Sequence, residues 1–259
     1  MGGTQSTPSA VECHHGAFVP DVQRRRHSGL RMLCLHGHGS NNDITMLQVH
    51  NLLLRETHGI SCDLFEAELE TSANVPALEM FSDRPFRTWF RWYMPTAGPL
   101  ATSTLDDSLE RIMAVVREQG PYDGIYGFSQ GAFTATTFCN PTVWRGRFGL
   151  DTCPFRFCIL ANAGLSDSLT TCSVAQAPQQ HEKKPLRAML AFPMNLPSVH
   201  LVGAKDWYKS SQTRNATLYE RAVTYEHAYG HEIPLNLQHD HNLVSTLTRF
   251  LGAFTDDRF

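Results

Sequence analysis

Short apolar runs alternate along this chain with longer segments in which apolar residues recur every three or four positions. The runs have the length of buried strands, and the recurring pattern is typical of helices that bury one face. Strands are predicted at residues 31–35, 60–66, 122–126, 155–161, 199–203 and 223–227. Helices are predicted after a cap at Asn42 or Asp43, from Asp106 to Gly120, over 132–138 and over 243–254. This alternation predicts an α/β fold, a doubly wound and mostly parallel sheet with helices on both faces.

Three segments lack such a pattern. Residues 1–28 are polar and aperiodic, and we interpret them as a flexible N-terminal tail ahead of a single domain over 29–259. Residues 70–104 are rich in loops and contain an aromatic cluster between Phe86 and Tyr93. Residues 164–197 are rich in Ser, Thr, Gln and Pro, which favours a lid or surface excursion over core structure. The aromatic cluster either lines an acyl pocket or forms a small separate core under a long loop.

Composition narrows the class of protein. A chain of 259 residues, 42% of them hydrophobic, is ordinary for one α/β domain. A net charge of -3 gives no general attraction to nucleic acid or anionic lipid, so a small-molecule substrate is expected and a nucleic-acid partner is not. Seven scattered cysteines without a C-x-x-C pair favour free thiols in a reducing compartment. With no long apolar run and no signal-peptide pattern, we expect no transmembrane segment and a cytoplasmic location.

The strand predicted at 122–126 leads into Gly127-Phe128-Ser129-Gln130-Gly131, and a helix follows at once. A G-x-S-x-G motif between a strand and a helix is typical of a sharp turn that holds a nucleophilic serine in a strained conformation. Flanking glycines are needed because a Cβ atom there would collide with the neighbouring strand and helix. Ser129 is therefore the candidate nucleophile.

A serine nucleophile needs a histidine to take its proton and a carboxylate to orient that histidine. In α/β-hydrolases the three residues follow in the order serine, acid, histidine, with the last two on loops after later strands. Asp206 follows the strand predicted at 199–203, and His231 follows the strand predicted at 223–227. Asp206 and His231 are therefore the candidate acid and base.

Other residues compete for these roles. His200 lies within a predicted strand and His227 at the end of another, where packing is the simpler interpretation. His239 and His241 flank Asp240, but two histidines at this spacing without a third ligand are more typical of a polar helix start than of a metal site. No metal and no cofactor is expected.

Attack on an acyl carbonyl also needs two backbone N–H groups directed at the developing oxyanion. One is expected from Gln130, the residue after the nucleophile. The other is expected from His38, in the turn His36-Gly37-His38-Gly39 after the first strand, where glycines let the backbone approach a substrate. A glycine-rich strand-to-helix turn without a ligand is the alternative interpretation of this segment.

Four segments together carry a family resemblance: LCLHGHGSN at 33–41, GPYDGIYGFSQGA at 120–132, HLVGAKD at 200–206 and HAYGHEIP at 227–234. They resemble the signatures of the FSH-type serine hydrolases, and the resemblance extends from Leu30 to Phe254. It implies an α/β-hydrolase fold, carboxylesterase or thioesterase activity, and a triad of Ser129, Asp206 and His231. Some fungal members of that family are similar enzymes that release polyketides from synthase-bound thioesters.

The preferred hypothesis is a serine hydrolase that cleaves a carboxylic ester or an acyl thioester through an acyl-enzyme. Its substrate would be a small molecule, either free or bound to a carrier protein. The alternative is a catalytically silent binding or scaffold protein that keeps a hydrolase fold. Separately, Met1–Ser6 fit the N-myristoylation pattern at Gly2, with Arg24–Arg26 as a second, electrostatic anchor.

Overall fold

A computed structural model describes residues 29–52, 54, 57–91, 105–164 and 190–255 of the chain. The predicted N-terminal tail and the Gly2 motif lie outside these residues, as do 92–104 of the first predicted excursion and 165–189 of the second. No helix in the described ranges is both long enough and apolar enough to cross a membrane.

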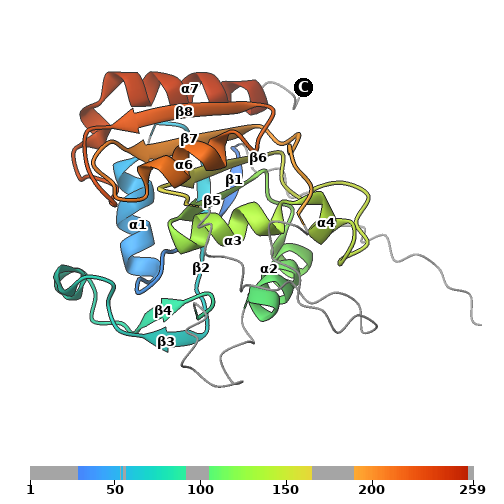
Figure 1. The fold of residues 1–259 in the computed structure, drawn as a ribbon, viewed down its shortest axis with the longest axis horizontal. Helices are drawn as coiled ribbons and strands as arrows, with labels where there is room; N and C mark the ends of the chain where they lie inside the picture. The colour runs from blue at the N-terminus through green and yellow to red at the C-terminus, as the bar shows by residue number, and fades with distance from the viewer. Residues whose placement is uncertain (1–28, 53, 55–56, 92–104, 165–189, 256–259) are drawn as a thin grey trace, which may run out of the picture.

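A six-stranded sheet forms the centre of the fold (Figure 1). Its strands are β1 (Arg31–Leu35), β2 (Ser61–Phe65), β5 (Gly124–Phe128), β6 (Phe157–Ala161), β7 (Ser198–Gly203) and β8 (Ala222–His227). They lie in the order β2-β1-β5-β6-β7-β8, and every neighbouring pair is parallel. The predicted α/β class with a mostly parallel sheet is confirmed.

Helices cover both faces of the sheet, as the alternation predicted (Figure 1). They are α1 (Asn42–Asn51), α2 (Leu105–Gln119), α3 (Gln130–Phe138), α4 (Pro141–Trp144), α6 (Lys209–Ala216) and α7 (His241–Thr255). One face packs against apolar residues of α2, α3 and α4, and the other packs against those of α1 and α7. Because β5 and β6 are buried on both sides, their sequences are continuous apolar runs rather than alternating ones.

Several predicted boundaries were wrong by one or two residues, and two of them lie close to the candidate site. Asn41, rather than Asn42 or Asp43, caps α1, and its Oδ1 accepts hydrogen bonds from the N–H groups of Asp43 at 3.1 Å and Ile44 at 3.2 Å. β5 begins at Gly124, two residues later than predicted, because Met32 of β1 pairs with Gly124. β5 ends at Phe128, so Ser129 follows the strand directly.

The segment predicted as a loop from 70 to 104 contains regular structure. β3 (Leu69–Thr71) and β4 (Phe86–Thr88) form an antiparallel pair, and the 3-10 helix η1 (Pro76–Met80) lies between them. Figure 1 shows this hairpin at the lower edge of the view, beyond β2. Trp89 and Phe90 are 1% exposed and belong to the main core, so the expectation of a separate small core is wrong for them.

The second predicted excursion also ends in core structure. Leu190, Met194 and Leu196 are buried and pack in the same cluster as α2 and α3. Met194 forms a parallel bridge with Tyr219, which fixes this segment beside the end of α6. The absence of regular periodicity in 190–197 concealed these contacts, and the surface assignment was wrong there.

Candidate active site

The candidate residues gather where the strand order reverses. β1 has its next strand along the chain, β2, on one side and β5 on the other. The loops that leave the carboxyl ends of β1 and β5 therefore run to opposite faces and open a crevice, which is where open α/β sheets bind ligands. Leu35 pairs with Gly127, so the turn at His36–Gly39 lies beside the turn at Ser129.

Ser129 lies on a strained turn between β5 and α3. Its φ of 51° and ψ of -114° belong to a region that residues with a side chain rarely adopt. A Cβ atom on Gly127 would lie 2.5 Å from the backbone nitrogen of Ala132, and one on Gly131 would lie 2.3 Å from the carbonyl oxygen of His36. Both flanking glycines are therefore required by close approach of the backbone, for the reason inferred from the motif.

The structure brings Ser129, His231 and Asp206 into one chain of hydrogen bonds. Nε2 of His231 lies 2.8 Å from Oγ of Ser129, and Nδ1 of His231 lies 2.6 Å from Oδ2 of Asp206. The side chain of Asp206 is fully buried, and that of His231 is 9% exposed. Since Asp206 can only accept when it is ionised, Nδ1 of His231 carries the hydrogen and Nε2 is free to accept one from Ser129.

Several donors converge on the buried carboxylate of Asp206. Nδ2 of Asn162 donates to Oδ2 at 2.9 Å, Nε2 of Gln212 also donates to Oδ2, and the N–H of Tyr208 donates to Oδ1 at 2.8 Å. Burial raises the pKa of Asp206, but the hydrogen bonds from Asn162 and Tyr208 and the proximity of His231 outweigh it and hold the pKa below its usual value. The carboxylate is therefore ionised at neutral pH.

Backbone hydrogen bonds at the ends of β7 and β8 hold the loops that carry Asp206 and His231 side by side. The N–H of Ala204 donates to the carbonyl of His227 at 2.8 Å, and that of Lys205 donates to the carbonyl of Tyr229 at 3.0 Å. A Cβ atom on Gly203 would lie only 2.2 Å from the carbonyl oxygen of Gly230. The close approach of the two loops sets the short distance between Asp206 and His231.

Thr88 links the two residues whose N–H groups were expected to bind the oxyanion. Its hydroxyl lies 2.9 Å from Nδ1 of His38 and 2.8 Å from Oε1 of Gln130. Gln130 is held further by the N–H of Trp89, which donates to Oε1 at 2.9 Å, and by Phe90, whose carbonyl accepts from Nε2 at 2.8 Å. Among the residues the structure describes, the backbone N–H groups of His38 and Gln130 donate to no other residue.

His36 is buried beneath this turn. Burial lowers the pKa of His36 to about 4, so its ring is neutral at physiological pH. Nε2 accepts a hydrogen bond from the N–H of Ala67 at 3.0 Å, which leaves the ring hydrogen on Nδ1, 2.6 Å from the carbonyl oxygen of Gly37. Trp89 stacks on the ring at 5.0 Å and donates its indole N–H to the carbonyl of His36. His36 thus supports the glycine turn from within.

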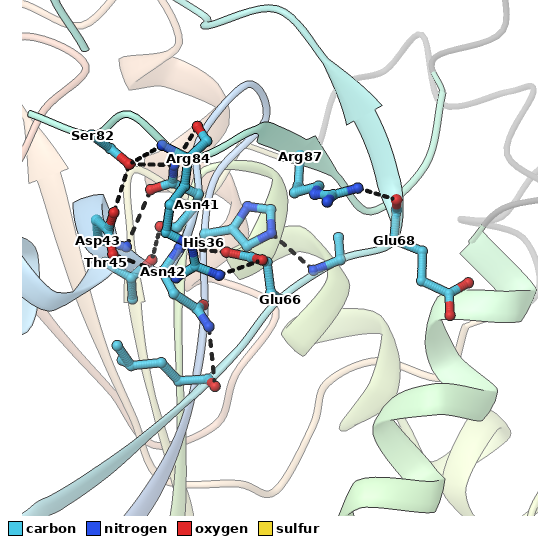
Figure 2. Close-up of polar contacts among 12 residues, drawn as sticks. His36, Asn41, Asn42, Asp43, Thr45, Glu66, Glu68, Ser82, Arg84 and Arg87 are labelled. Atoms are coloured by element: carbon cyan, nitrogen blue, oxygen red, sulfur yellow. Dashed lines mark hydrogen bonds and ion pairs between the residues drawn. The ribbon is translucent and has the colours of Figure 1, made fainter. Parts of the chain in front are cut away.

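A polar network fastens the start of α1 to the hairpin (Figure 2). Nδ2 of Asn41 donates to Oγ of Ser82 at 2.9 Å, and Ser82 in turn donates to Asp43 at 2.6 Å. Arg84 pairs with Glu66 at 2.9 Å and with Asp43 at 3.4 Å, and about half of its side chain is exposed. These contacts connect the loop that follows the glycine turn to β2 and to the hairpin segment.

The competing residues are not part of this arrangement. His200 and His227 are buried, at 1% and 2% exposure, and burial lowers the pKa of each. Asp240 accepts from the N–H groups of Asn242 and Leu243 and so caps α7, the polar helix start that the sequence indicated. The described residues contain no group of three or more His, Cys, Asp or Glu side chains that could hold a metal ion.

Three residues in contact with the site were missed from the sequence. Thr88 lies in a segment predicted as a loop, and Gln212 lies on α6, which was not predicted. Asn162 follows a predicted strand and adopts a φ of 51°. Asparagine tolerates that conformation. The sequence offered one signal that Asn162 belongs to the site: it follows β6 directly, at the edge of the sheet where Ser129 and Asp206 also lie.

Comparison with known proteins identifies the family. The sequence model of the family described as serine hydrolase (FSH1) matches residues 26–243. The chain belongs to the serine hydrolase (FSH1) family. Esterase FPY3 of Fusarium mangiferae is 29% identical over 212 residues, which cover 79% of this chain and 88% of that protein. Hydrolase phiM of Talaromyces stipitatus is 26% identical over 222 residues, which cover 79% and 81%.

Solved structures place this FSH1-family member in the α/β-hydrolase fold. The crystal structure of esterase PE8 matches with a TM-score of 0.51 at 16% identity, covering 86% of this chain and 92% of that one. At this identity the likeness concerns the fold alone. The family match and the fold confirm the resemblance inferred from the four motifs. Family membership and the relatives that are esterases and hydrolases show that the protein is an enzyme of the hydrolase class.

Proposed function

We propose that this FSH1-family hydrolase cleaves a carboxylic ester or an acyl thioester through a triad of Ser129, His231 and Asp206. The observation that carries the proposal is the continuous hydrogen-bond chain from Oγ of Ser129 to His231 at 2.8 Å and from His231 to Asp206 at 2.6 Å. Both distances lie within the reach that proton transfer requires. Family membership favours the same reaction class.

The first half of the reaction forms an acyl-enzyme. His231 accepts the hydroxyl hydrogen on Nε2 as Oγ of Ser129 attacks the carbonyl carbon. The buried carboxylate of Asp206 stabilises the resulting imidazolium and keeps the hydrogen on Nδ1. His231 then gives its proton to the departing alkoxide or thiolate, and the bond between the carbonyl carbon and the leaving group breaks.

The second half returns the enzyme to its starting state. Water replaces the leaving group, and His231 takes a proton from it as the water oxygen attacks the acyl carbon of the ester on Ser129. The bond between the acyl carbon and Oγ of Ser129 then breaks, His231 returns the proton to Oγ, and the carboxylic acid is released. In both halves the N–H groups of Gln130 and His38 would donate to the tetrahedral oxyanion. Support for that role comes from Thr88, which holds both residues, and from the two N–H groups, which donate to no other residue in the described part of the chain.

The substrate is a small molecule that carries an ester or thioester, either free or attached to a carrier protein. The esterase name of the Fusarium relative favours the ester. Release of a polyketide or another acyl product from a carrier-bound thioester is the narrower form of the proposal, and it rests on the resemblance to fungal members of the family.

Hydrolysis of a short p-nitrophenyl ester tests the proposal. The wild type should turn over, and Ser129→Ala should lower kcat by roughly 10⁴-fold or more, since the nucleophile is lost. Ser245→Ala, on the exposed side of α7, is the matched control and should keep full activity. A wild type no faster than Ser129→Ala would instead favour the silent scaffold.

Parallel profiles of p-nitrophenyl esters and acyl thioesters of matched chain length test the substrate class. A carrier-linked thioester substrate predicts kcat/KM at least tenfold higher for a pantetheine thioester than for the simple ester of the same acyl group. Equal values, or a preference for the ester, would contradict the narrower proposal while leaving the hydrolase assignment in place.

A further inference from the structure

Three aromatic rings enclose the imidazole of His231. Trp207 stacks on it with ring centroids 5.2 Å apart and an interplanar angle of 26°. Phe128 lies at 5.4 Å on a tilted ring, and Tyr208 presents its edge at 6.1 Å. The rings come from two places, Phe128 from the end of β5 and the other two from the loop between β7 and α6. Together with Ser129 and Asp206, which contact its two ring nitrogens, they surround the His231 side chain, which is 9% exposed.

Trp207 differs from the other large aromatic residues of the described chain in how little of it is buried. It is 71% exposed, whereas Phe81 and Tyr208 are 48% and 46% exposed and the tryptophans Trp89 and Trp144 are buried. An indole so exposed gains little from the hydrophobic effect, because that gain scales with the area removed from water. Its ring contacts are with His231 and, at 5.7 Å, with Tyr208. Core packing therefore does not explain its position.

The loop holds Trp207 in place through its neighbours. The N–H of Lys209 donates to the carbonyl of Asp206 at 3.0 Å, and the N–H of Tyr208 donates to the carboxylate of Asp206. Lys209 also pairs with Glu226 of β8 at 2.8 Å. The turn around Trp207 is thus held by hydrogen bonds to Asp206 and by the ion pair of Lys209, and in the structure the indole lies stacked on His231.

The face of an indole attracts a cation within about 6 Å of the ring centroid, and tryptophan is the strongest of the aromatic side chains in this respect. In the proposed mechanism His231 is neutral before attack and carries a positive charge in the transition state. A stacked indole therefore interacts more strongly with the transition state than with the ground state, which is the condition for an effect on the rate.

We propose that Trp207 is a positioning residue that stabilises the protonated form of His231 in the transition state and fixes the plane of its ring. The inference rests on the proposed function, because it needs His231 to act as the base. The proposal gives a role to Trp207, a residue next to Asp206 whose side chain contacts the triad by ring stacking rather than by a hydrogen bond.

Other titratable groups also face His231. The Asp206 carboxylate approaches Nδ1 from the loop after β7, and the Tyr208 phenol belongs to the same loop. Ser129 and Phe128 come from the end of β5 and carry no charge in the working range. Since only Trp207 is changed in the test below, the contributions of these groups to the charge state of His231 are the same in the wild type and the variants.

Replacement of Trp207 by leucine should lower kcat by about 3- to 30-fold, the range expected for loss of a partly desolvated cation–π contact. KM should change less than twofold, and the loss should be the same for short and long acyl chains. Trp207→Phe keeps an aromatic face and should recover most of the activity. Met80→Ala, at another exposed apolar residue, is the control and should have wild-type kinetics.

The pH profile gives a readout that a merely structural role would not move. Loss of the indole face disfavours the charged imidazole, so the midpoint of the acidic limb of kcat/KM should move to lower pH by about half a unit to one unit in Trp207→Leu. The midpoint in Trp207→Phe should lie between that of the leucine variant and that of the wild type. Trp207→Gln provides a second non-aromatic variant in case the leucine variant does not fold.

Two results would overturn the inference. One is an unchanged kcat and pH profile in both non-aromatic variants. The other is a loss confined to KM that grows with the length of the acyl chain, which would make Trp207 a substrate platform. Failure of the proposed function is distinguishable, because Ser129→Ala would then retain the activity of the wild type.

Discussion

The loops on the two sides of Ser129 are fixed by different kinds of contact. On the side of β7 and β8, three side chains donate to a single oxygen of Asp206, and all of these groups are buried or nearly so. On the side of β1, the turn His36–Gly39 is supported from inside by Thr88 and by the ring of His36. Outside it lies the network of Asn41, Ser82 and Arg84, in which Asn41 is buried and the Arg84 side chain is about half exposed.

This difference predicts different sensitivity to substitution. A buried carboxylate makes strong, charge-assisted hydrogen bonds, so loss of one partner leaves a poorly compensated charge. Exposed ion pairs contribute little, and the loss of one is shared among the remaining contacts. Single substitutions should therefore be most costly beside Asp206, intermediate at Thr88 and smallest at Arg84.

Asp206→Asn should have the largest effect of these. The amide no longer fixes the hydrogen on Nδ1 of His231 or stabilises the imidazolium, and kcat should fall by roughly 10³- to 10⁴-fold. Steady-state ester hydrolysis measures it. Asp240→Asn keeps the cap of α7, since asparagine caps helices as well as aspartate does, and should leave kcat unchanged. Equal losses of kcat in the two variants would contradict the role of Asp206 in orienting His231.

Asn162→Gly removes a donor from Asp206 without strain, because glycine adopts a φ of 51° freely. Loss of one hydrogen bond to a charged group should lower kcat/KM by about 10- to 100-fold. Asn140→Gly, at a buried asparagine beyond the far end of α3, is the control. It should lower stability while keeping kcat within about twofold, since loss of a buried hydrogen bond acts on folding rather than on the transition state.

The same variant makes a prediction about pH. The pKa of Asp206 is lowered in the folded protein, so its ionisation stabilises the fold above the unfolded value of about 4, and that stability is lost as the pH falls. The destabilisation caused by Asn162→Gly should therefore be largest at neutral pH and shrink below about pH 4. Urea unfolding at pH 7 and pH 3 measures the difference, and an equal destabilisation at both would contradict the charge-assisted bond.

Thr88→Val keeps the shape of the side chain and removes the hydroxyl that connects His38 with Gln130. Both N–H groups remain but are less well oriented, so we expect a loss of about tenfold in kcat, smaller than for removal of an oxyanion donor outright. Thr71→Val, on the partner strand of the same hairpin, should keep full activity. If both variants were fully active, Thr88 would be a packing residue only.

Arg84→Ala should have the smallest effect. The pairs with Glu66 and Asp43 are partly exposed, and their loss should lower the free energy of unfolding by less than about 1 kcal/mol. Ester turnover should stay within about twofold of the wild type, since the contact lies outside the turn. A loss as large as that of Thr88→Val would show that the outer network, rather than Thr88, determines the geometry of the turn.

The sequence predicted the parts of the fold whose patterns are local. β6 is a continuous apolar run, β1 and β7 are mostly apolar, and α2 has apolar residues at helical spacing, so each was placed within two residues. The order of strands then placed Ser129, Asp206 and His231 at one edge of the sheet, and the structure brings them together there.

The remaining parts depend on contacts between distant segments. Thr88 meets Gln130 only because a hairpin of two three-residue strands folds beneath the glycine turn, and such short strands have no periodicity to detect. α6 is polar along most of its length, so its inward-facing Gln212 gave no amphipathic signal. Trp207 was visible in the sequence, but its stacking on His231 follows from the pairing of two loops.

Covalent labelling with a fluorophosphonate probe tests the central claim most directly, because such probes react with a serine that an adjacent base has activated. The account predicts a single adduct, mapped by mass spectrometry to the peptide that contains Ser129. The adduct should be absent in Ser129→Ala and strongly slowed in His231→Ala. Label that persists in Ser129→Ala, or that maps to another serine in the wild type, would contradict the assignment of Ser129 as the nucleophile.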